Sequence, residues 1–231
     1  MEIIQAINKA CDCYKEKKPL SPVGIVVHST GANNPYLKRY CNNPKELGIN
    51  KYNNYAGTGT SAEQASAGIA HAYIGLDKDG KIAVAQTLPF NIRCWGCGSG
   101  VNGSYNVSHI QFEICEDSLN DKNYFSVAML TAAEFCAEMI KRYPAIRISN
   151  IVSHAEAAGR GYASNHGDPD HWLKMYGKNM DWFRDMITDH ITESEVYRVQ
   201  VGAFKNRENA EKLKTELSKK GYSTIIVKGV I

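Results

Sequence analysis

The stretch VGIVVHSTG, residues 23–31, starts with a short apolar run that closes on His28. A second stretch, ISNIVSHAE at residues 148–156, has the same form and closes on His154. Both runs are typical of β-strands, so each histidine is expected where a strand runs out into a loop. A strand end fixes an imidazole and leaves its outward nitrogen accessible, which suits a catalytic zinc ion with an open position. One such histidine alone is weak evidence, and the pair is the starting point.

Composition indicates a packed globular protein. The chain has 231 residues, of which 43% are hydrophobic, 10% aromatic and 22% charged, with both signs evenly mixed. The formal net charge of +3 is too small, and the basic residues too scattered, to indicate nucleic-acid binding. Seven cysteines are an odd number without the spacing of a secreted disulfide framework, so we expect reduced thiols.

No targeting or membrane segment is expected. Residues 1–5 carry no basic segment followed by a long apolar stretch, and no window approaches 18 apolar residues. These features predict a soluble chain without an export signal of its own and without membrane insertion.

Periodicity predicts a central sheet flanked by helices. The expected elements are an amphipathic helix over residues 3–14, the strand before His28, a strand at 69–76, a turn at 77–80, a return strand at 81–85, a strand at 109–115, a helix over 132–143, the strand before His154 and a helix over 183–190. The polar stretch 31–59 is expected to be a long loop, the kind of segment that carries binding surfaces, and Asn50 within it is a predicted substrate contact.

The strand at 109–115 alternates cleanly. Ile110, Phe112 and Ile114 share one face, and Glu113 lies on the other. The carboxylate of Glu113 is therefore expected to point away from the apolar core.

Three histidines and three acids occur within residues 154–172. Zinc binds imidazole nitrogen and carboxylate oxygen, and a catalytic zinc needs three protein ligands and a water. His28, His154 and one further residue could supply that set. The candidates for the third ligand are Asp168, His166, His171 and Asp170. A solvated loop whose acids cap helices explains the same composition equally well.

Four separated blocks of sequence resemble one known family. The blocks are VVHST at 26–30, GIAHAYI at 68–74 with DKDG at 77–80, SHIQFE at 108–113, and SHAE at 153–156 with GDP at 167–169. In this order they resemble the zinc-dependent N-acetylmuramoyl-L-alanine amidases of the amidase 2 family, which share their fold with peptidoglycan-recognition proteins and many phage endolysins. The resemblance covers residues 23–172 and implies an α/β fold with a central mixed β-sheet.

The resemblance also implies roles for particular residues. Zinc (Zn²⁺) would be bound by His28, His154 and Asp168, Glu113 would activate the zinc-bound water, and His166 would support the developing oxyanion. These roles suit the residues' chemistry, because a carboxylate can pass a proton to a leaving amine and an N–H donor can stabilise negative charge.

Some positions depart from the family's pattern. Ala70 stands where some members carry a tyrosine, and Gly96 follows Trp95 where relatives often show Trp-His. Trp95 is a predicted cleft residue that stacks on sugar, and His71 is a predicted substrate contact, with a supporting or structural role as the favoured alternative.

The pair Cys94 and Cys97 has the spacing of metal-binding or redox cysteines. A structural zinc usually needs four ligands, and the other close pair, Cys11 and Cys13, has the wrong spacing. A second metal site is therefore not favoured.

The chain's last part contains YRVQVGAF at 197–204, NAE at 209–211 and GY at 221–222. These residues resemble the opening of a sporulation-related (SPOR) repeat, a module that binds peptidoglycan glycan strands. The predicted organisation is a catalytic domain at 1–191, a linker at 192–195 and a partial SPOR-like segment at 196–231. A strand, a helix capped by Asn206 and ended by Gly221, and a second strand form a βαβ unit too small to bury its own core. Such a unit is expected to dock on the larger domain or to pair in a homodimer.

The expected function is hydrolysis of the amide between N-acetylmuramic acid and L-alanine in bacterial peptidoglycan, leading to wall lysis as by an endolysin or autolysin. Two rivals stay open. One is a recognition module that binds stem peptide without cutting it, and the other is a zinc peptidase acting within the stem peptide. The chain is expected to act on the wall after release from the cytoplasm.

Overall fold

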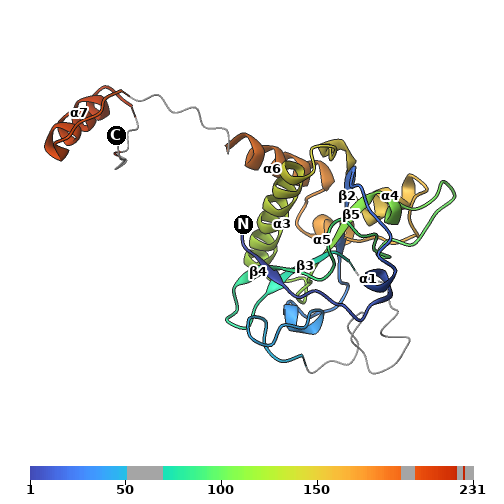
Figure 1. Cartoon of the computed structure of the whole chain (residues 1–231). Helices are drawn as coiled ribbons and strands as arrows, with labels where there is room; N and C mark the ends of the chain where they lie inside the picture. Colours follow the sequence, from blue (N-terminus) through green and yellow to red (C-terminus); the bar gives the residue numbers. More distant parts are fainter. Residues whose placement is uncertain (51–69, 194–200, 223–225, 227–231) are drawn as a thin grey trace. The chain divides into compact units, whose positions relative to one another are not determined.

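The computed structural model describes residues 1–50, 70–193, 201–222 and 226 (Figure 1). The chain divides into two compact units, Met1–Ser194 and Glu195–Ile231, which are treated separately. Within the described residues, no helix combines the length and hydropathy needed to cross a membrane.

Unit 1 is built on a six-stranded mixed sheet in the order β1-β4-β3-β5-β2-β6. The strands are β1 (Ile3–Gln5), β2 (Gly24–Ser29), β3 (Ala72–Leu76), β4 (Ile82–Gln86), β5 (His109–Ile114) and β6 (Ile151–Ser153). Strands β3, β5, β2 and β6 are parallel neighbours, β3 and β4 form the expected antiparallel hairpin, and β1 pairs parallel with β4. The predicted mixed sheet with flanking helices is confirmed.

The helices of unit 1 are α1 (Asp12–Glu16), α3 (Lys122–Arg142), α4 (His154–Gly159), α5 (Asp170–Met175) and α6 (Met180–Glu193), with single 3₁₀ turns at Leu37–Arg39, Tyr105–Val107 and Ile148–Asn150. The long helix α3 starts where the Asp121 side chain accepts hydrogen bonds from the backbone N–H groups of Asn123 and Tyr124. It ends at Lys141 and Arg142, whose positive charges suit a helix C-terminus.

One face of the sheet carries the main apolar core. Strand alternation sends Ile25 and Val27 of β2, with Phe112 of β5, into a single cluster with α3, α5 and α6. Trp172 of α5 and Phe183 of α6 are fully buried in the same cluster. The continuous apolar layer between sheet and helices is the main source of the unit's stability.

The opposite face carries polar side chains at its centre. Val26 and Gln111 are register partners on β2 and β5, and His28 and Glu113 are the next such pair along the strands. This face therefore presents an imidazole and a carboxylate from adjacent parallel strands, as the alternation of residues 109–115 predicts.

Two predicted elements are wrong. Residues 3–5 form strand β1 instead of the start of a helix, since Ile3 packs against the main core and Ile4 against the cluster on the other face. That alternation has the period of a strand, and only residues 12–16 are helical. His154 is followed by helix α4 instead of a loop, because Ser153 caps that helix.

The second unit has one described helix, α7 (Arg207–Lys219), capped by the Asn206 side chain, which accepts a hydrogen bond from Glu208 N. Gly221 follows with a left-handed φ of 88°, so the predicted helix and its two ends are confirmed. The first predicted strand rests on the alternation of Tyr197, Val199 and Val201; Val201 is not in a strand, and the rest lies outside the described residues. Most of the other predicted strand also lies outside them.

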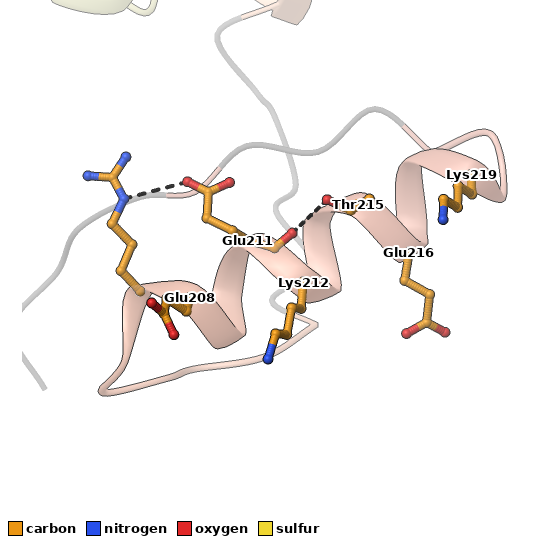
Figure 2. A pocket seen from close by; sticks show the side chains of 7 residues that line it. Glu208, Glu211, Lys212, Thr215, Glu216 and Lys219 are labelled. Atoms are coloured by element: carbon orange, nitrogen blue, oxygen red, sulfur yellow. Dashed lines mark hydrogen bonds and ion pairs between the residues drawn. The ribbon is translucent and has the colours of Figure 1, made fainter.

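A shallow hollow runs along α7 (Figure 2). Its lining consists of Arg207, Glu208, Glu211, Lys212, Thr215, Glu216 and Lys219. Three cations and three carboxylates are mixed there, as on a solvated helix face, and the Arg207 Nε to Glu211 Oε1 distance is 3.5 Å. The described linker residues 192 and 193 belong to the end of α6.

The core is testable through neighbouring residues of α3. Met129 is 1% exposed and Leu130 is 50% exposed. We expect Met129→Ala to lower the free energy of unfolding of unit 1 by about 2–5 kcal/mol, because it leaves a cavity against the sheet. Leu130→Ala, the matched control, should change it by less than about 0.5 kcal/mol. Urea denaturation followed by circular dichroism measures both, and equal effects would contradict this account of the core.

Candidate metal centre

Parallel pairing of β2 with β6 brings together two histidines that are 126 residues apart in sequence. Val27 is the register partner of Ser153, so His28 and His154 follow at the same end of adjacent strands. Both side chains are buried, at 1% and 3% exposure. Their Nδ1 atoms lie 3.0 Å apart.

The start of α4 fixes the position of His154. Ser153 and Glu156 form a capping box, in which each side chain accepts a hydrogen bond from the other's backbone N–H. Arg184 of α6 donates to both carboxylate oxygens of Glu156, at 2.9 and 3.0 Å. The first turn of α4, which carries His154, is thereby anchored to α6.

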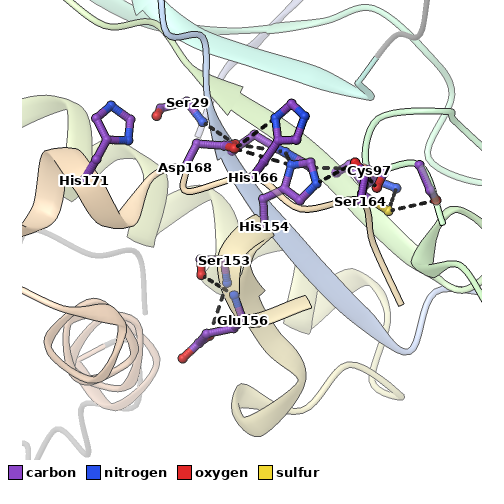
Figure 3. A network of polar contacts seen from close by, with 12 residues as sticks. Ser29, Cys97, Ser153, His154, Glu156, Ser164, His166, Asp168 and His171 are labelled. Carbon is purple, nitrogen blue, oxygen red and sulfur yellow. Dashed lines mark hydrogen bonds and ion pairs between the residues drawn. The ribbon is translucent and has the colours of Figure 1, made fainter. Parts of the chain in front are cut away.

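Asp168 completes a three-residue group (Figure 3). Its Oδ2 lies 3.2 Å from His28 Nδ1, and its Oδ1 lies 3.4 Å from His154 Nδ1. Among the described residues, these three form the one group of His, Cys, Asp or Glu whose donor atoms converge closely enough to hold a metal ion.

The geometry of the group fits zinc. Tetrahedral zinc with ligand bonds of about 2.0–2.1 Å places neighbouring donor atoms roughly 3.3 Å apart. The two imidazole Nδ1 atoms lie 3.0 Å apart, and Asp168 faces each of them with a different oxygen, Oδ2 at 3.2 Å from His28 and Oδ1 at 3.4 Å from His154. With one atom taken from each residue, the donors lie within 4.8 Å of one another. Two imidazoles and one carboxylate also leave a fourth position open.

Electrostatics hold the acid in the form that binds metal. Burial acts to raise the pKa of Asp168, but hydrogen bonds from His154 and His28 outweigh it and keep that pKa far below its usual range. Burial acts to lower the pKa of His28. The hydrogen bond to Asp168 and the nearby negative charge of Glu113 outweigh burial and raise that pKa above its ordinary value. Asp168 and His28 therefore stabilise each other's charged forms.

Glu113 lies beside this group on β5. Its register partners are His28 on β2 and Tyr73 on β3, so it sits in the middle of a row across the sheet. Its Oε2 atom is buried and has no hydrogen-bond partner. Burial raises the pKa of Glu113 to about 7, opposed by the His28 charge and assisted by Asp168. A carboxyl group with that pKa can take up and release a proton near neutrality.

His166 lies at the exposed edge of the group. Its side chain is 62% exposed, its ring stacks in parallel on His154 at 4.6 Å, and its Nδ1 is 3.7 Å from Asp168 Oδ1. It is not one of the three convergent ligands. Its exposed position allows it to face a bound substrate.

A second polar cluster supports the Asp168 segment and was not identified from the sequence. Buried Glu116 accepts a hydrogen bond from the Ser29 hydroxyl, and its Oε1 lies 3.0 Å from His171 Nε2 on α5. Ser29 N also donates to Asp168 Oδ2 at 3.4 Å. His171, a candidate third ligand, instead binds Glu116. The signal available in the sequence was an acid one residue past the end of the 109–115 strand.

The predicted substrate contacts have different outcomes. His71 is fully buried, with Nε2 2.8 Å from the carbonyl oxygen of Ile92 and Nδ1 accepting from Gln111 N, so a direct substrate contact by His71 is wrong. The side chain of His71 joins its own segment to the backbone of Ile92 and Gln111, which fits the structural role predicted as the alternative. Trp95 is 37% exposed and Asn50 is partly buried, and their contacts with substrate stay predictions.

The cysteines are free thiols, as expected from their number and spacing. All seven are buried free thiols, and none belongs to a convergent metal group among the described residues. Burial raises the pKa of the Cys94 and Cys97 thiols, which keeps them protonated.

The mixed sheet and its flanking helices make unit 1 an α/β protein. Its described residues hold one candidate metal site, formed by two histidines and a carboxylate near the ends of the central strands. Residues 18–171 match the family described as N-acetylmuramoyl-L-alanine amidase, known as Amidase_2, and the chain belongs to that family. Residues 193–230 match the SPOR domain.

One curated relative is similar to the chain in sequence, and solved structures are similar to it in fold. The chain is 31% identical over 143 residues to the N-acetylmuramoyl-L-alanine amidase CwlA of a Bacillus species, covering 61% of this chain and 46% of that relative. It therefore spans about half the length of the curated relative that it matches. The fold is similar to that of the Staphylococcus aureus hydrolase AmiA, with a TM-score of 0.59, 18% identity and coverage of 84% and 85% of the two chains. A mutant endolysin from Bacillus subtilis has a TM-score of 0.53 at 21% identity, with coverage of 81% and 99%.

The ligand set is testable by metal content. We expect Ala at His28, His154 or Asp168 to reduce zinc bound per chain, because each change removes one of three donors. His166→Ala is the matched control on the same loop and should retain zinc. Atomic emission after dialysis measures the ratio. Full occupancy in Asp168→Ala would remove Asp168 from the ligand set, and zinc loss in His166→Ala would add His166.

Proposed function

We propose that unit 1 hydrolyses the amide between N-acetylmuramic acid and L-alanine in bacterial peptidoglycan, with zinc held by His28, His154 and Asp168. The observation that carries the proposal is the convergence of these three residues beside the carboxylate of Glu113, whose buried Oε2 atom has no hydrogen-bond partner. Membership of the amidase family supports the choice of bond.

Each residue has a part that follows from its chemistry. When bound, zinc supplies a Lewis acid that polarises the scissile carbonyl and lowers the pKa of water to about 7. Glu113 takes the proton of the attacking water on Oε2 and returns it to the leaving amine of L-alanine. His166, exposed beside the metal ligands, donates an N–H to the oxyanion. Peptidoglycan lies outside the cytoplasmic membrane, so the enzyme acts there.

The rival functions differ in their products. Mass spectrometry of purified peptidoglycan digested by the full chain should show new N-terminal L-alanine with intact glycan. New amino groups elsewhere in the stem peptide would indicate a peptidase. Binding without any new amino group would indicate a recognition module and would contradict the proposal.

The role of Glu113 is testable by Glu113→Gln, which preserves size but cannot take up a proton. We expect zinc content and peptidoglycan binding to persist while the rate of L-alanine release falls by roughly 10² or more. Glu134→Gln is a carboxylate control, because Glu134 is exposed on helix α3 and does not belong to the metal group. An unimpaired rate in Glu113→Gln would exclude the general-base role.

For the second unit we propose binding of peptidoglycan glycan, supported by the SPOR match, and pairing with the same segment of a second chain. Helix α7 has no buried residue, and Leu213 and Leu217 on it are only partly buried. Apolar surface of this kind favours association, and symmetric pairing of two half repeats would cover it.

The pairing is testable by deleting residues 195–231. We expect the mass in solution, measured by light scattering, to fall from dimer to monomer, and binding to purified walls to weaken. Leu213→Asp in the full chain separates the two effects, because it breaks an apolar contact without removing the unit. An unchanged mass in both variants would contradict pairing.

A further inference from the structure

The two histidines among the candidate zinc ligands, His28 and His154, present Nδ1 to the metal position. Metal binding through Nδ1 requires the proton of each neutral imidazole to be on Nε2. A neutral imidazole can carry its proton on either nitrogen, and the partner of the outward nitrogen selects the form. We infer that the backbone of one residue, Cys97, sets this choice for both histidines, through the side chains of Asn106 and Gln111 for His28 and through the side chain of Ser164 for His154. The inference rests on the proposed zinc site.

The first path runs from the backbone N–H of Cys97 to His28. Cys97 N donates to Asn106 Oδ1 at 3.1 Å, and this N–H can only donate, so the atom that it meets is the amide oxygen. Asn106 Nδ2 donates to the carbonyl of Gly98 at 3.2 Å, which fixes the same orientation from the other end.

Gln111 continues that path. Its Nε2 donates to Asn106 Oδ1 at 2.8 Å, because an oxygen facing an oxygen would repel it. Its Oε1 therefore faces His28 Nε2, at 3.0 Å, and must accept from it. Gln111 is fully buried, so no water competes for these positions. The result leaves the Nδ1 lone pair of His28 free for the metal.

The second path runs from the carbonyl of the same residue to His154. The Cys97 carbonyl accepts from Ser164 N at 2.9 Å and from Ser164 Oγ at 3.2 Å. With its proton committed to that carbonyl, Ser164 Oγ presents a lone pair to His154 Nε2, at 3.3 Å. The imidazole must donate there, which frees its Nδ1. Figure 3 shows Cys97 and Ser164 on the side of His154 away from Asp168.

Gly96 leaves room for this arrangement. A Cβ at Gly96 would collide with Gln111 Oε1, the atom that accepts from His28. Gly96 does not have a left-handed φ, so alanine there would act through this contact and not through backbone strain. The absence of a side chain at the position following Trp95 thus has a structural reason in this chain.

The test measures zinc affinity by competition with a chromophoric chelator, in the absence of peptidoglycan. We expect Gln111→Met, Ser164→Ala and Gly96→Ala each to bind zinc about 10- to 100-fold more weakly than the full wild-type chain. Ser164→Thr keeps the hydroxyl and should restore affinity. Ser108→Ala is the matched control, since the Ser108 hydroxyl pairs with His109 Nδ1 in the same stretch of chain and lies on neither path.

A second readout observes the protons themselves. Long-range ¹H–¹⁵N spectra of the zinc-loaded wild-type chain should show His28 and His154 protonated on Nε2 and zinc-bound through Nδ1. This measurement needs no variant, so it holds even where Gln111→Met fails to fold. A proton on Nδ1 of either ring, or wild-type zinc affinity in folded Gln111→Met and Ser164→Ala, would overturn the inference. If zinc is bound through Nδ1 of both histidines, with their protons on Nε2, but no L-alanine is released, only the proposed function would be overturned.

Discussion

The parallel pairing of β2 with β5 on one side and β6 on the other is the constraint on which the rest of the site depends. Register places His28 beside Glu113 and puts His154 at the same end of the next strand. Because side chains alternate along a strand, a slip of one residue would turn His28 into the core and Val27 onto the site face. The apolar layer on α3 therefore also secures the position of the metal ligands.

Buried charge on the site face is tolerated because it is matched locally. The carboxylate of Asp168 pairs with the two buried imidazoles of His28 and His154. The buried carboxylate of Glu116 pairs with Ser29 and His171. A buried polar group without a partner is costly. Among the described residues two buried carboxylate oxygens have no partner, Glu113 Oε2 and Asp170 Oδ2, and the one on Glu113 lies beside the metal group, where it trades stability for chemistry. Both histidines have neutral partners, Gln111 on β5 for His28 and Ser164 after α4 for His154. Ser164 also donates to the carbonyl of Cys97, which joins the segments around residues 97 and 164.

The two units differ in how they are held together. Unit 1 has a continuous core with fully buried side chains such as Trp172 and Phe112. Helix α7 has none, and its stability depends on its caps, on pairs such as Lys220 with Glu216, and on whatever covers its apolar side. The SPOR match and the amidase match thus correspond to segments with different folding requirements.

The sequence by itself determined the central strands, the hairpin, the part of helix α3 from residue 132 onward and the polar side of the 109–115 strand, because these depend on local periodicity. Motif resemblance added the group of His28, His154 and Asp168, while residue chemistry alone left four candidates for the third ligand. The tertiary structure decided what depends on partners distant in the chain. Strand β1 forms because β4 is available to pair with it, His71 is a buried structural residue because backbone from two other segments surrounds it, and the Gln111 and Ser164 contacts exist because two loops meet at Cys97. No local pattern encodes such contacts, since each partner is an ordinary polar residue until the fold brings it close.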